Sequence, residues 1–331
     1  MDLIIHTFGT LVSCSKGSFV VSTRDGERKT LVPSGISSIQ IGKGVQITSD
    51  AIFLAIENEI EIILVPRSGQ PVGRFWSARY GSVSTIRKGQ LLFTHSAEAV
   101  DWIKSVVSKK ILNQQALLLA FECGTYHLHH EVEKAVSRME ELLLKIKELN
   151  GQQVRDVAAS LRGWEGVASK IYFSVVSRFL PERYRFTERS QHPALDVANA
   201  LFNYAYGVLY GKIEGALVLA GIDPYLGVMH RDEYHRPVLV YDVIENYRIW
   251  ADYVVVSILC QEVITDEYYS VCSDGCVWLE SLGRRVLIQS MNDYLDEVVL
   301  VSGLSRSRGV HLQLDMQRLA QHFKTLGSQR E

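Results

Sequence analysis

The hydrophobic pattern of this 331-residue chain changes near residue 80, and that change constrains the fold more than any other feature. Before it, short runs rich in β-branched residues are separated by turns that contain Gly or Pro, as expected for β-strands. After it, apolar residues recur with the period of a helix. A chain of this length also exceeds a typical single core. We therefore predict an α+β protein with a small β-rich domain at 1–80 and a larger, mainly α-helical domain at 81–331.

Individual elements follow from the same patterns. The strand candidates are SFVVST, SSIQIG, VQITS and EIEIILV. One helix-like segment lies among them, SDAIFLAIEN, for which Ser49 and Asp50 are the predicted N-caps. In the second domain we predict long helices over 98–121, 131–150, 153–179, 193–221 and 239–264.

The composition limits the class of protein. Hydrophobic residues make up 47% of the chain and charged residues 22%, as in an ordinary soluble globular protein. The formal net charge of −2 gives no global basic signature, so any DNA site must come from local clusters of Lys and Arg. The chain starts without a signal-peptide pattern, and its longest apolar run is too short for a membrane span. We expect a cytoplasmic protein with no membrane association.

Two short motifs invite a metal interpretation that the sequence does not favour. Cys272 and Cys276 stand in CSDGC, but no second Cys or His pair follows at zinc-finger spacing. His127, His129 and His130 cluster in YHLHHE, at the expected entrance of a helix. We interpret the cysteines as small core or loop residues and the histidines as part of a polar surface. Five cysteines in a chain of this length indicate reduced thiols.

An acidic residue in LRGWEGVASKIYF (161–173) needs an explanation. Wound as a helix, this stretch places Glu165 on the same face as Leu161, Ala168 and Tyr172. A carboxylate on such a face is costly unless something pairs with it. Either a basic side chain or a metal ion is therefore expected beside Glu165.

A second segment, which begins at AGIDPYLGVMH, carries more groups of the same kind. His230 ends this apolar stretch, and Asp242 and Glu245 follow in VLVYDVIENYR, on one side of a helix. An imidazole and two carboxylates suit Mg²⁺ or Mn²⁺, and such sites are common in enzymes that attack phosphodiesters. The alternative is a set of ion pairs, with Glu165 bound to Arg162 or Lys170 and Glu245 bound to Arg248. The pattern of residues leaves both interpretations open.

Three ordered motifs together resemble one family, the CRISPR-associated endonuclease/integrase that inserts new spacers into CRISPR arrays. They are LRGWEG, the block RSQHPALDVANALFNYAYGVLYGKIEGALVLAGIDPYLGVMH, and VLVYDVIENYR. The resemblance runs over nearly the whole chain. It departs from the family pattern at SQHPALD, where His192 is an unusual neighbour, and it is loose in the C-terminal part.

The resemblance implies a role for five residues. Glu165, His230 and Glu245 match the family's catalytic metal ligands for Mg²⁺ or Mn²⁺. Asp242 matches a further acid close to the metal, and Asn199 matches an asparagine expected to orient a ligand. The resemblance also implies that the N-terminal β domain dimerises and that the helical domain is catalytic.

The activity implied by the resemblance is insertion of spacer DNA into a CRISPR array. A 3′-hydroxyl of the incoming DNA attacks a repeat phosphodiester, and attack by water gives endonuclease cleavage. The implied partners are double-stranded and partly single-stranded DNA, a second copy of the chain, and a small ferredoxin-like CRISPR-associated protein whose dimer joins a larger complex. Basic residues after the first motif and beyond are the candidate DNA contacts: Lys170, Arg178, Arg183, Arg185, Arg189 and Arg248.

Other functions remain possible at this point. A transposon-type integrase of the same lineage would act without the small partner. A DNA-binding scaffold that has lost catalysis would have no need of buried acids. A metal-dependent hydrolase of small phosphate esters would show no salt-sensitive DNA binding.

Overall fold

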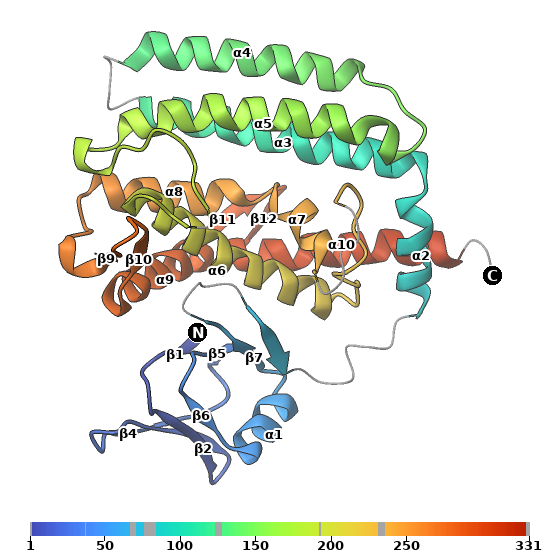
Figure 1. The fold of residues 1–331 in the computed structure, drawn as a ribbon. Coiled ribbons are helices and arrows are strands. Elements are labelled where there is room, and N and C mark those ends of the chain that lie inside the picture. The colour runs from blue at the N-terminus through green and yellow to red at the C-terminus, as the bar shows by residue number, and fades with distance from the viewer. Residues whose placement is uncertain are drawn as a thin grey trace. The chain divides into compact units, whose positions relative to one another are not determined.

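The computed structural model describes residues 2–36, 38–66, 71–75, 84–122, 128–191, 193–230 and 236–328. The chain divides into two compact units, Met1–Val83 and Ser84–Glu331. The first is rich in strands and the second is mainly helical (Figure 1). The predicted α+β fold class is therefore confirmed. The predicted boundary near residue 80 lies outside the described residues.

Within the residues that the structure describes, the first unit contains two sheets and one helix. One sheet has the strand order β1-β5-β7-β8 and the other β4-β3-β2-β6. The elements are β1 (Asp2–Ile5), β2 (Leu11–Ser15), β3 (Ser18–Ser22), β4 (Arg28–Leu31), β5 (Ser38–Ile41), β6 (Gln46–Ile47), α1 (Ser49–Glu57), β7 (Glu61–Leu64) and β8 (Gly73–Phe75). Strands β1, β5 and β7 pair in parallel. Phe19, Ile39 and Ile62 are fully buried in the core of this unit.

The four predicted strands and the predicted helix of this unit are all present as β3, β5, β6, β7 and α1. One detail of the prediction was wrong. The N-cap of α1 is Thr48, whose hydroxyl accepts a hydrogen bond from the backbone N–H of Ala51 at 3.3 Å. Ser49 and Asp50 instead form the first turn, where the Asp50 carboxylate favours the positive end of the helix dipole.

In its described part, the second unit is built from long helices with two small hairpins. Its helices are α2 (Ser84–Thr94), α3 (Ala97–Glu122), α4 (His129–Glu148), α5 (Val154–Phe179), α6 (Val197–Leu219), α7 (Val238–Ile244), α8 (Arg248–Cys260), α9 (Ser281–Asp296) and α10 (Arg308–Ser328). Its strands are β9 (Tyr269–Val271), β10 (Val277–Leu279), β11 (Val298–Val301) and β12 (Leu304–Ser307). Each pair of strands forms an antiparallel hairpin.

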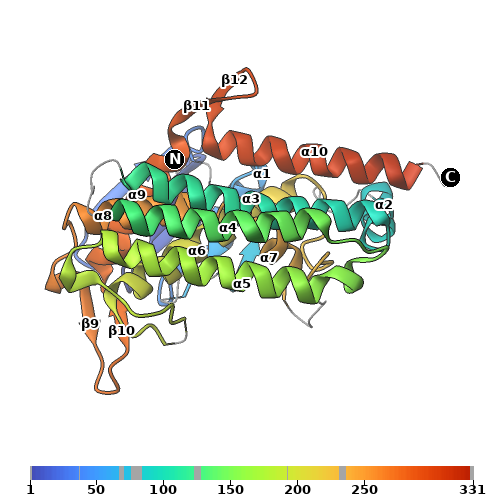
Figure 2. The same cartoon turned by 90° about the horizontal axis from the view of Figure 1, so that it is seen from above.

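Helices α3, α4 and α5 pack against one another, with α4 above α3 and α5 in Figure 1 and the three nearly parallel in Figure 2. Helix α6 is the most buried element, with apolar residues on nearly every side. It packs against α7, α8, α9 and α10. The long helices therefore bring residues from distant parts of the sequence onto a common core, which is a precondition for the predicted site.

Helices α2 and α10 approach each other unusually closely, because two glycines stand at their contact. A Cβ atom added to Gly89 would lie 1.7 Å from the carbonyl oxygen of Phe323, and one added to Gly327 would lie 2.2 Å from that of Thr85. Larger residues at these positions would force the helices apart. This pair of glycines ties the C-terminal helix to the start of the second unit.

The predicted helices of the second unit are present, with one correction. The single helix predicted over 239–264 is two helices, α7 and α8, separated by a turn at Glu245–Tyr247. No Gly or Pro marks this break in the sequence, so the apolar pattern ran through it. The break matters because it places Glu245 at the end of a helix instead of within one.

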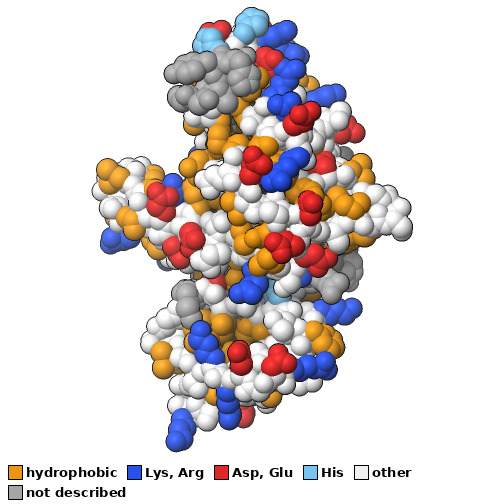
Figure 3. Space-filling view, turned by 90° about the vertical axis from the view of Figure 1, so that its left-hand side faces the viewer, with side chains coloured by type: hydrophobic (Ala, Val, Ile, Leu, Met, Phe, Trp, Pro, Cys, Tyr) orange, Lys and Arg blue, Asp and Glu red, His pale blue; other side chains and the backbone are white. Residues whose placement is uncertain are grey.

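Among the described residues, no helix is both long enough and apolar enough to cross a membrane. On the face drawn in Figure 3, Lys and Arg side chains lie among Asp and Glu side chains and do not merge into one basic patch. This distribution agrees with the small net charge and leaves local clusters as the place to look for DNA contacts.

Candidate active site

Glu165 lies in the middle of α5, a helix that begins with a capping box formed by Gln153 and Asp156. Leu161, Ala168 and Tyr172 are fully buried, as the helical pattern predicted. The Glu165 side chain is 24% exposed and sits at the edge of this buried face. Its Oε1 contacts the ammonium group of Lys110 and accepts a hydrogen bond from the Ser169 hydroxyl at 3.2 Å.

Glu245 is the C-cap of α7, and its side chain is 8% exposed. Arg248 Nε donates a 2.8 Å hydrogen bond to Oε1, and Lys110 Nζ lies 2.5 Å from Oε2. Burial alone would raise the pKa of Glu245, but the charges of Arg248 and Lys110 outweigh it and lower the pKa to about 2. The carboxylate is therefore ionised although it is buried.

The two glutamates meet on Lys110, which projects from α3 and is 7% exposed. A basic side chain therefore balances the charge of Glu165, as one of the two alternatives predicted. It is Lys110, however, and not Arg162 or Lys170, the two partners that the sequence had suggested. Sequence reasoning missed Lys110. The available signal was its position three and four residues after Val107 and Val106, which puts a lysine on the buried stripe of its helix.

His230 is fixed by Asp242, a fully buried residue of α7. Asp242 Oδ1 lies 2.6 Å from His230 Nδ1 and accepts the His230 backbone N–H at 3.2 Å. Its Oδ2 accepts the backbone N–H groups of Val228 and Met229 at 2.7 and 3.0 Å. The hydrogen bond to Asp242 raises the pKa of His230. Because Nδ1 is engaged in this way, Nε2 is the nitrogen left for another partner.

The three predicted ligands converge only in part. Glu165 and Glu245 share one cationic group, and the Glu245 charge also contributes to the raised pKa of His230. The donor atoms of Glu165, His230 and Glu245 do not all lie within 4.8 Å of one another. Among the described residues, Cys272, Asp274 and Cys276 are the group of Asp, Glu, His or Cys side chains that meets this distance.

The donor set nevertheless fits a hard divalent cation. Two carboxylates and an imidazole are ligands that Mg²⁺ and Mn²⁺ accept. Glu245 Oε2 is buried, and the ammonium group of Lys110 lies 2.5 Å from it. Lys110 thus supplies positive charge at the two carboxylates, where a divalent cation would supply it when bound.

Asn199 has different partners from those expected. It is fully buried near the start of α6, and Asp196 Oδ2 accepts from its Nδ2 at 2.6 Å. Its Oδ1 accepts hydrogen bonds from the Arg189 guanidinium and from the Ser190 backbone N–H. The structure therefore gives Asn199 the role of holding Arg189, and it shows no hydrogen bond from Asn199 to the three predicted ligands.

Two of the six candidate DNA contacts are partly buried against partners within the protein. Burial lowers the pKa of Arg189, whose guanidinium bonds Asn199 and Asn203 and lies over the ring of Phe202. Arg248 binds Glu245, and its side chain is 25% exposed. These guanidinium groups are held by partners within the protein instead of projecting to solvent.

The other four candidates are exposed: Lys170, Arg178, Arg183 and Arg185. Arg178 forms an ion pair with Glu131 across α4 and α5. It lines a shallow pocket of about 290 Å³ together with two further basic residues, Lys134 and Arg138. Sequence reasoning did not group these three residues, because α4 and α5 bring them together only in the folded chain.

The structure describes some residues of the remaining sequence motifs and leaves others undescribed. His129 and His130 are exposed at the start of α4. His127, His192 and Cys123 lie outside the described residues. Cys272 and Cys276 flank the turn between β9 and β10.

The chain is therefore a β-rich unit followed by a helical unit, in which Glu165 and Glu245 pair with Lys110 and Asp242 holds His230. Comparison with known proteins identifies the family. The family model for "CRISPR associated protein Cas1" matches residues 3–293. The CRISPR-associated endonuclease Cas1 1 of Archaeoglobus fulgidus is 30% identical over 307 residues, which is 89% of this chain and 88% of that protein. The chain belongs to the Cas1 family, and the resemblance drawn from the motifs is confirmed.

Two solved structures share the fold. A casposase bound to its integration product superposes with a TM-score of 0.83 at 18% identity, covering 98% of this chain and 91% of that one. A chain of a Cas6-RT-Cas1–Cas2 complex superposes with a TM-score of 0.81 at 19% identity, covering 98% of this chain and 35% of that one.

Proposed function

We propose that this Cas1-family protein is a metal-dependent DNA endonuclease and integrase that inserts spacer DNA into a CRISPR array, with Glu165, His230 and Glu245 as its metal ligands. The observation that carries the proposal is the meeting of Glu165 and Glu245, from two distant segments, around a single buried positive charge. Two carboxylates brought together in this way are also ligands that a divalent cation accepts.

The family supports the chemistry. The relative from Archaeoglobus fulgidus is named an endonuclease, and one structure with the same fold holds the product of an integration reaction. Another is part of a complex with Cas2. We propose that this chain likewise acts on DNA as a homodimer joined by a small ferredoxin-like partner, and that it does so in the cytoplasm.

In the proposed reaction, a 3′-hydroxyl of the incoming DNA attacks a repeat phosphorus, and the bond from that phosphorus to the repeat 3′-oxygen breaks. With water as the nucleophile, the same bond is hydrolysed. Glu165, His230 and Glu245 would hold Mg²⁺ or Mn²⁺, which would supply positive charge to stabilise the reacting phosphate. Asp242 holds the His230 ring in one orientation, and Arg248 holds the carboxylate of Glu245. The exposed residues Lys170, Arg178, Arg183 and Arg185 are the proposed phosphate contacts.

The experiment compares Glu165→Gln and His230→Ala with Glu140→Gln, a control with the same chemical change at an exposed position of α4. The first two variants should lose Mn²⁺-dependent cleavage and strand transfer while binding DNA with near-normal affinity. The control should keep both. Activity in either ligand variant equal to that of the unmodified protein would refute the ligand set.

A second experiment separates the proposed function from its nearest alternative. A transposon-type integrase of the same lineage would insert DNA equally well with and without a Cas2-type partner. We expect insertion into a CRISPR repeat to require that partner. A scaffold that has lost catalysis would bind DNA and show no metal-dependent cleavage under either condition.

A further inference from the structure

The turn between β9 and β10 has a fixed geometry. The Cys272 backbone N–H donates to the Cys276 carbonyl at 2.8 Å, and the Gly275 N–H donates to the Cys272 carbonyl at 3.0 Å. Gly275 has a φ of +81°, which a larger residue would adopt only with strain. Next to the turn, Val277 N–H donates to the Ala194 carbonyl at 2.8 Å, which fastens the hairpin to the segment before α6.

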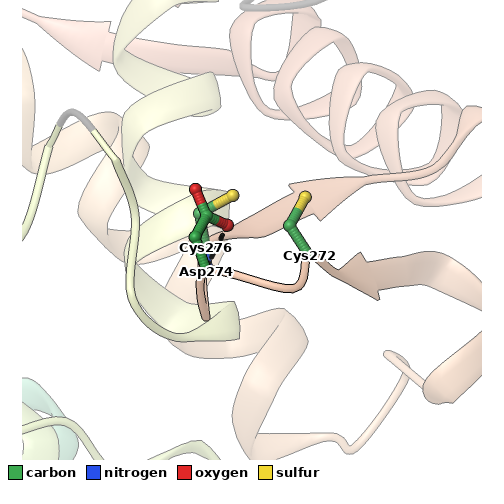
Figure 4. A group of neighbouring side chains, drawn as sticks. All are labelled: Cys272, Asp274 and Cys276. Carbon is green, nitrogen blue, oxygen red and sulfur yellow. Dashed lines mark hydrogen bonds between the residues drawn. The ribbon is translucent and has the colours of Figure 1, made fainter.

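Three side chains of this turn gather on one side of it, as Figure 4 shows. The Sγ atoms of Cys272 and Cys276 and a carboxylate oxygen of Asp274 all lie within 4.8 Å of one another. Two thiolates bound to zinc in a tetrahedron, at about 2.3 Å each, lie about 3.8 Å apart. Small side-chain rotations would therefore bring all three donors onto one ion.

The surroundings of the trio are those of a ligand set. Trp278 Nε1 donates a hydrogen bond to Cys276 Sγ at 3.2 Å, which holds this sulfur in place beside the turn. The Cys276 backbone N–H contacts Asp274 Oδ1 at 3.4 Å and orients the carboxylate. Cys276 is 5% exposed, whereas Asp274 is exposed and Cys272 half-buried. The buried Cys276 thus anchors the three side chains in the protein, and the exposed Asp274 leaves one side of the group open to solvent.

The sequence interpretation of these cysteines counted a zinc site as incomplete because it lacked a second Cys or His pair. The folded turn supplies a third ligand from within the motif, Asp274. Two sulfur donors and one oxygen donor, with a fourth position open to water, suit Zn²⁺ and are a poor match for Mg²⁺.

We propose that Cys272, Asp274 and Cys276 bind a zinc ion that links the two ends of the turn between β9 and β10. This site is separate from the candidate active site and shares no residue with it. It binds a soft cation through sulfur, whereas the glutamates and His230 offer ligands for a harder one.

The experiment uses the full chain, reduced and stripped of metal with a chelator, and titrates it with Co²⁺ as a spectroscopic probe in the absence of oxygen. We expect a sulfur-to-cobalt charge-transfer absorption that saturates at one equivalent and disappears when Zn²⁺ is added. Only sulfur ligands give this band. The His230→Ala variant should therefore retain it, even if Co²⁺ also binds at the candidate active site.

The variants follow from the geometry. Cys272→Ser and Cys276→Ser should abolish the band, and Asp274→Asn should weaken Co²⁺ binding by at least about tenfold. Asp274 is exposed, so its substitution tests ligation without endangering the fold. Trp278→Phe should weaken binding as well, because it removes the hydrogen bond to Cys276 Sγ. Cys260→Ser is the matched control with an exposed thiol, and it should keep the band.

Two results would overturn the proposal. One is a folded, reduced protein that shows no charge-transfer band with Co²⁺, or one whose band survives Cys272→Ser. The other is a count of free thiols that shows Cys272 and Cys276 joined in a disulfide under the reducing conditions of the assay. The two ends of the turn would then be linked by a covalent bond and not by a zinc ion.

Discussion

The ammonium group of Lys110 lies 2.5 Å from Oε2 of Glu245, and both side chains are buried. The same ammonium group contacts Glu165. Lys110 therefore occupies the place in the charge balance that a divalent cation would take in the proposed function. A lysine that neutralises two acids keeps the metal-free protein stable, and it competes with the ion for the same carboxylates.

Replacing Lys110 with Met tests this competition. Without the ammonium group, Glu165 loses its basic partner and Glu245 keeps only Arg248. The free energy of unfolding of the metal-free protein should therefore fall by about 3–5 kcal/mol. Mn²⁺ should then stabilise Lys110→Met more than it stabilises the unmodified protein, because binding to the native state adds stability. Urea unfolding with and without Mn²⁺ measures both effects.

Lys109→Met is the control for that experiment, since Lys109 is an exposed neighbour on the same helix. Its stability should change little, and its response to Mn²⁺ should match that of the unmodified protein. An equal response to Mn²⁺ in Lys110→Met would show that the lysine and the ion do not share a site.

Asp242 should matter for metal binding although it is buried behind His230. Its carboxylate accepts three backbone N–H groups and contacts His230 Nδ1. In Asp242→Asn, an amide N–H₂ group would replace one of the two accepting oxygens. It cannot accept these hydrogen bonds, so the His230 ring would lose its fixed orientation. We expect Mn²⁺ affinity to fall by about 10- to 100-fold. Counting free Mn²⁺ by electron paramagnetic resonance measures it, and unchanged affinity in a folded variant would contradict the role.

Asp252 should make stability depend on pH. It is fully buried between Tyr172 and Tyr206, whose hydroxyl groups donate to it at 3.0 and 2.5 Å. Burial raises its pKa to about 6, although these hydrogen bonds and two arginines lower it. The unfolded value is about 3.9, so the folded state binds more protons between these two values. Stability from this residue is therefore complete below about pH 4 and is lost as the pH rises through about 6.

The size of this effect follows from the difference between the two pKa values and is about 3 kcal/mol. Urea unfolding between pH 4.5 and 7 should show the decline in the unmodified protein and a flatter profile in Asp252→Asn. Glu245 opposes this trend only at lower pH, because its contribution is lost as the pH falls below about 4.5 toward 2. Asp101→Asn, at an exposed position, should keep the original slope. Identical profiles for the unmodified protein and Asp252→Asn would refute the assignment.

The fold was predictable from the sequence wherever burial is periodic. Helix α5 alternates buried and exposed faces along its whole length, and its predicted range differs from the observed one by a single residue. The turn at Glu245–Tyr247 has no Gly or Pro, so no local signal marked it. Hairpin β11–β12 was missed for another reason. Val298 and Leu300 are 63% and 73% exposed, so the strand has no buried face to produce a pattern.

The candidate site was predictable only for residues whose own surroundings are unusual. Glu165 and Glu245 are acids among apolar neighbours, and a single sequence shows that directly. Lys110 is joined to them by packing between α3, α5 and the end of α7, which no local pattern records. The same reason explains why Arg248 and Arg189 were placed at the DNA surface. Their positive charge is visible in the sequence, but the direction of their side chains is decided by distant partners.

Arg178 and Arg248 should therefore respond differently to substitution. Arg178 is exposed beside Lys134 and Arg138, so Arg178→Ala should remove one phosphate contact and reduce the slope of log K against log salt by about one. Arg248→Ala should leave that slope unchanged and lower the free energy of unfolding by about 3–5 kcal/mol, because it deprives the buried Glu245 of a partner. DNA titrations at several salt concentrations and urea unfolding of both variants separate the two roles. A reduced slope for Arg248→Ala would mean that its guanidinium reaches DNA after all.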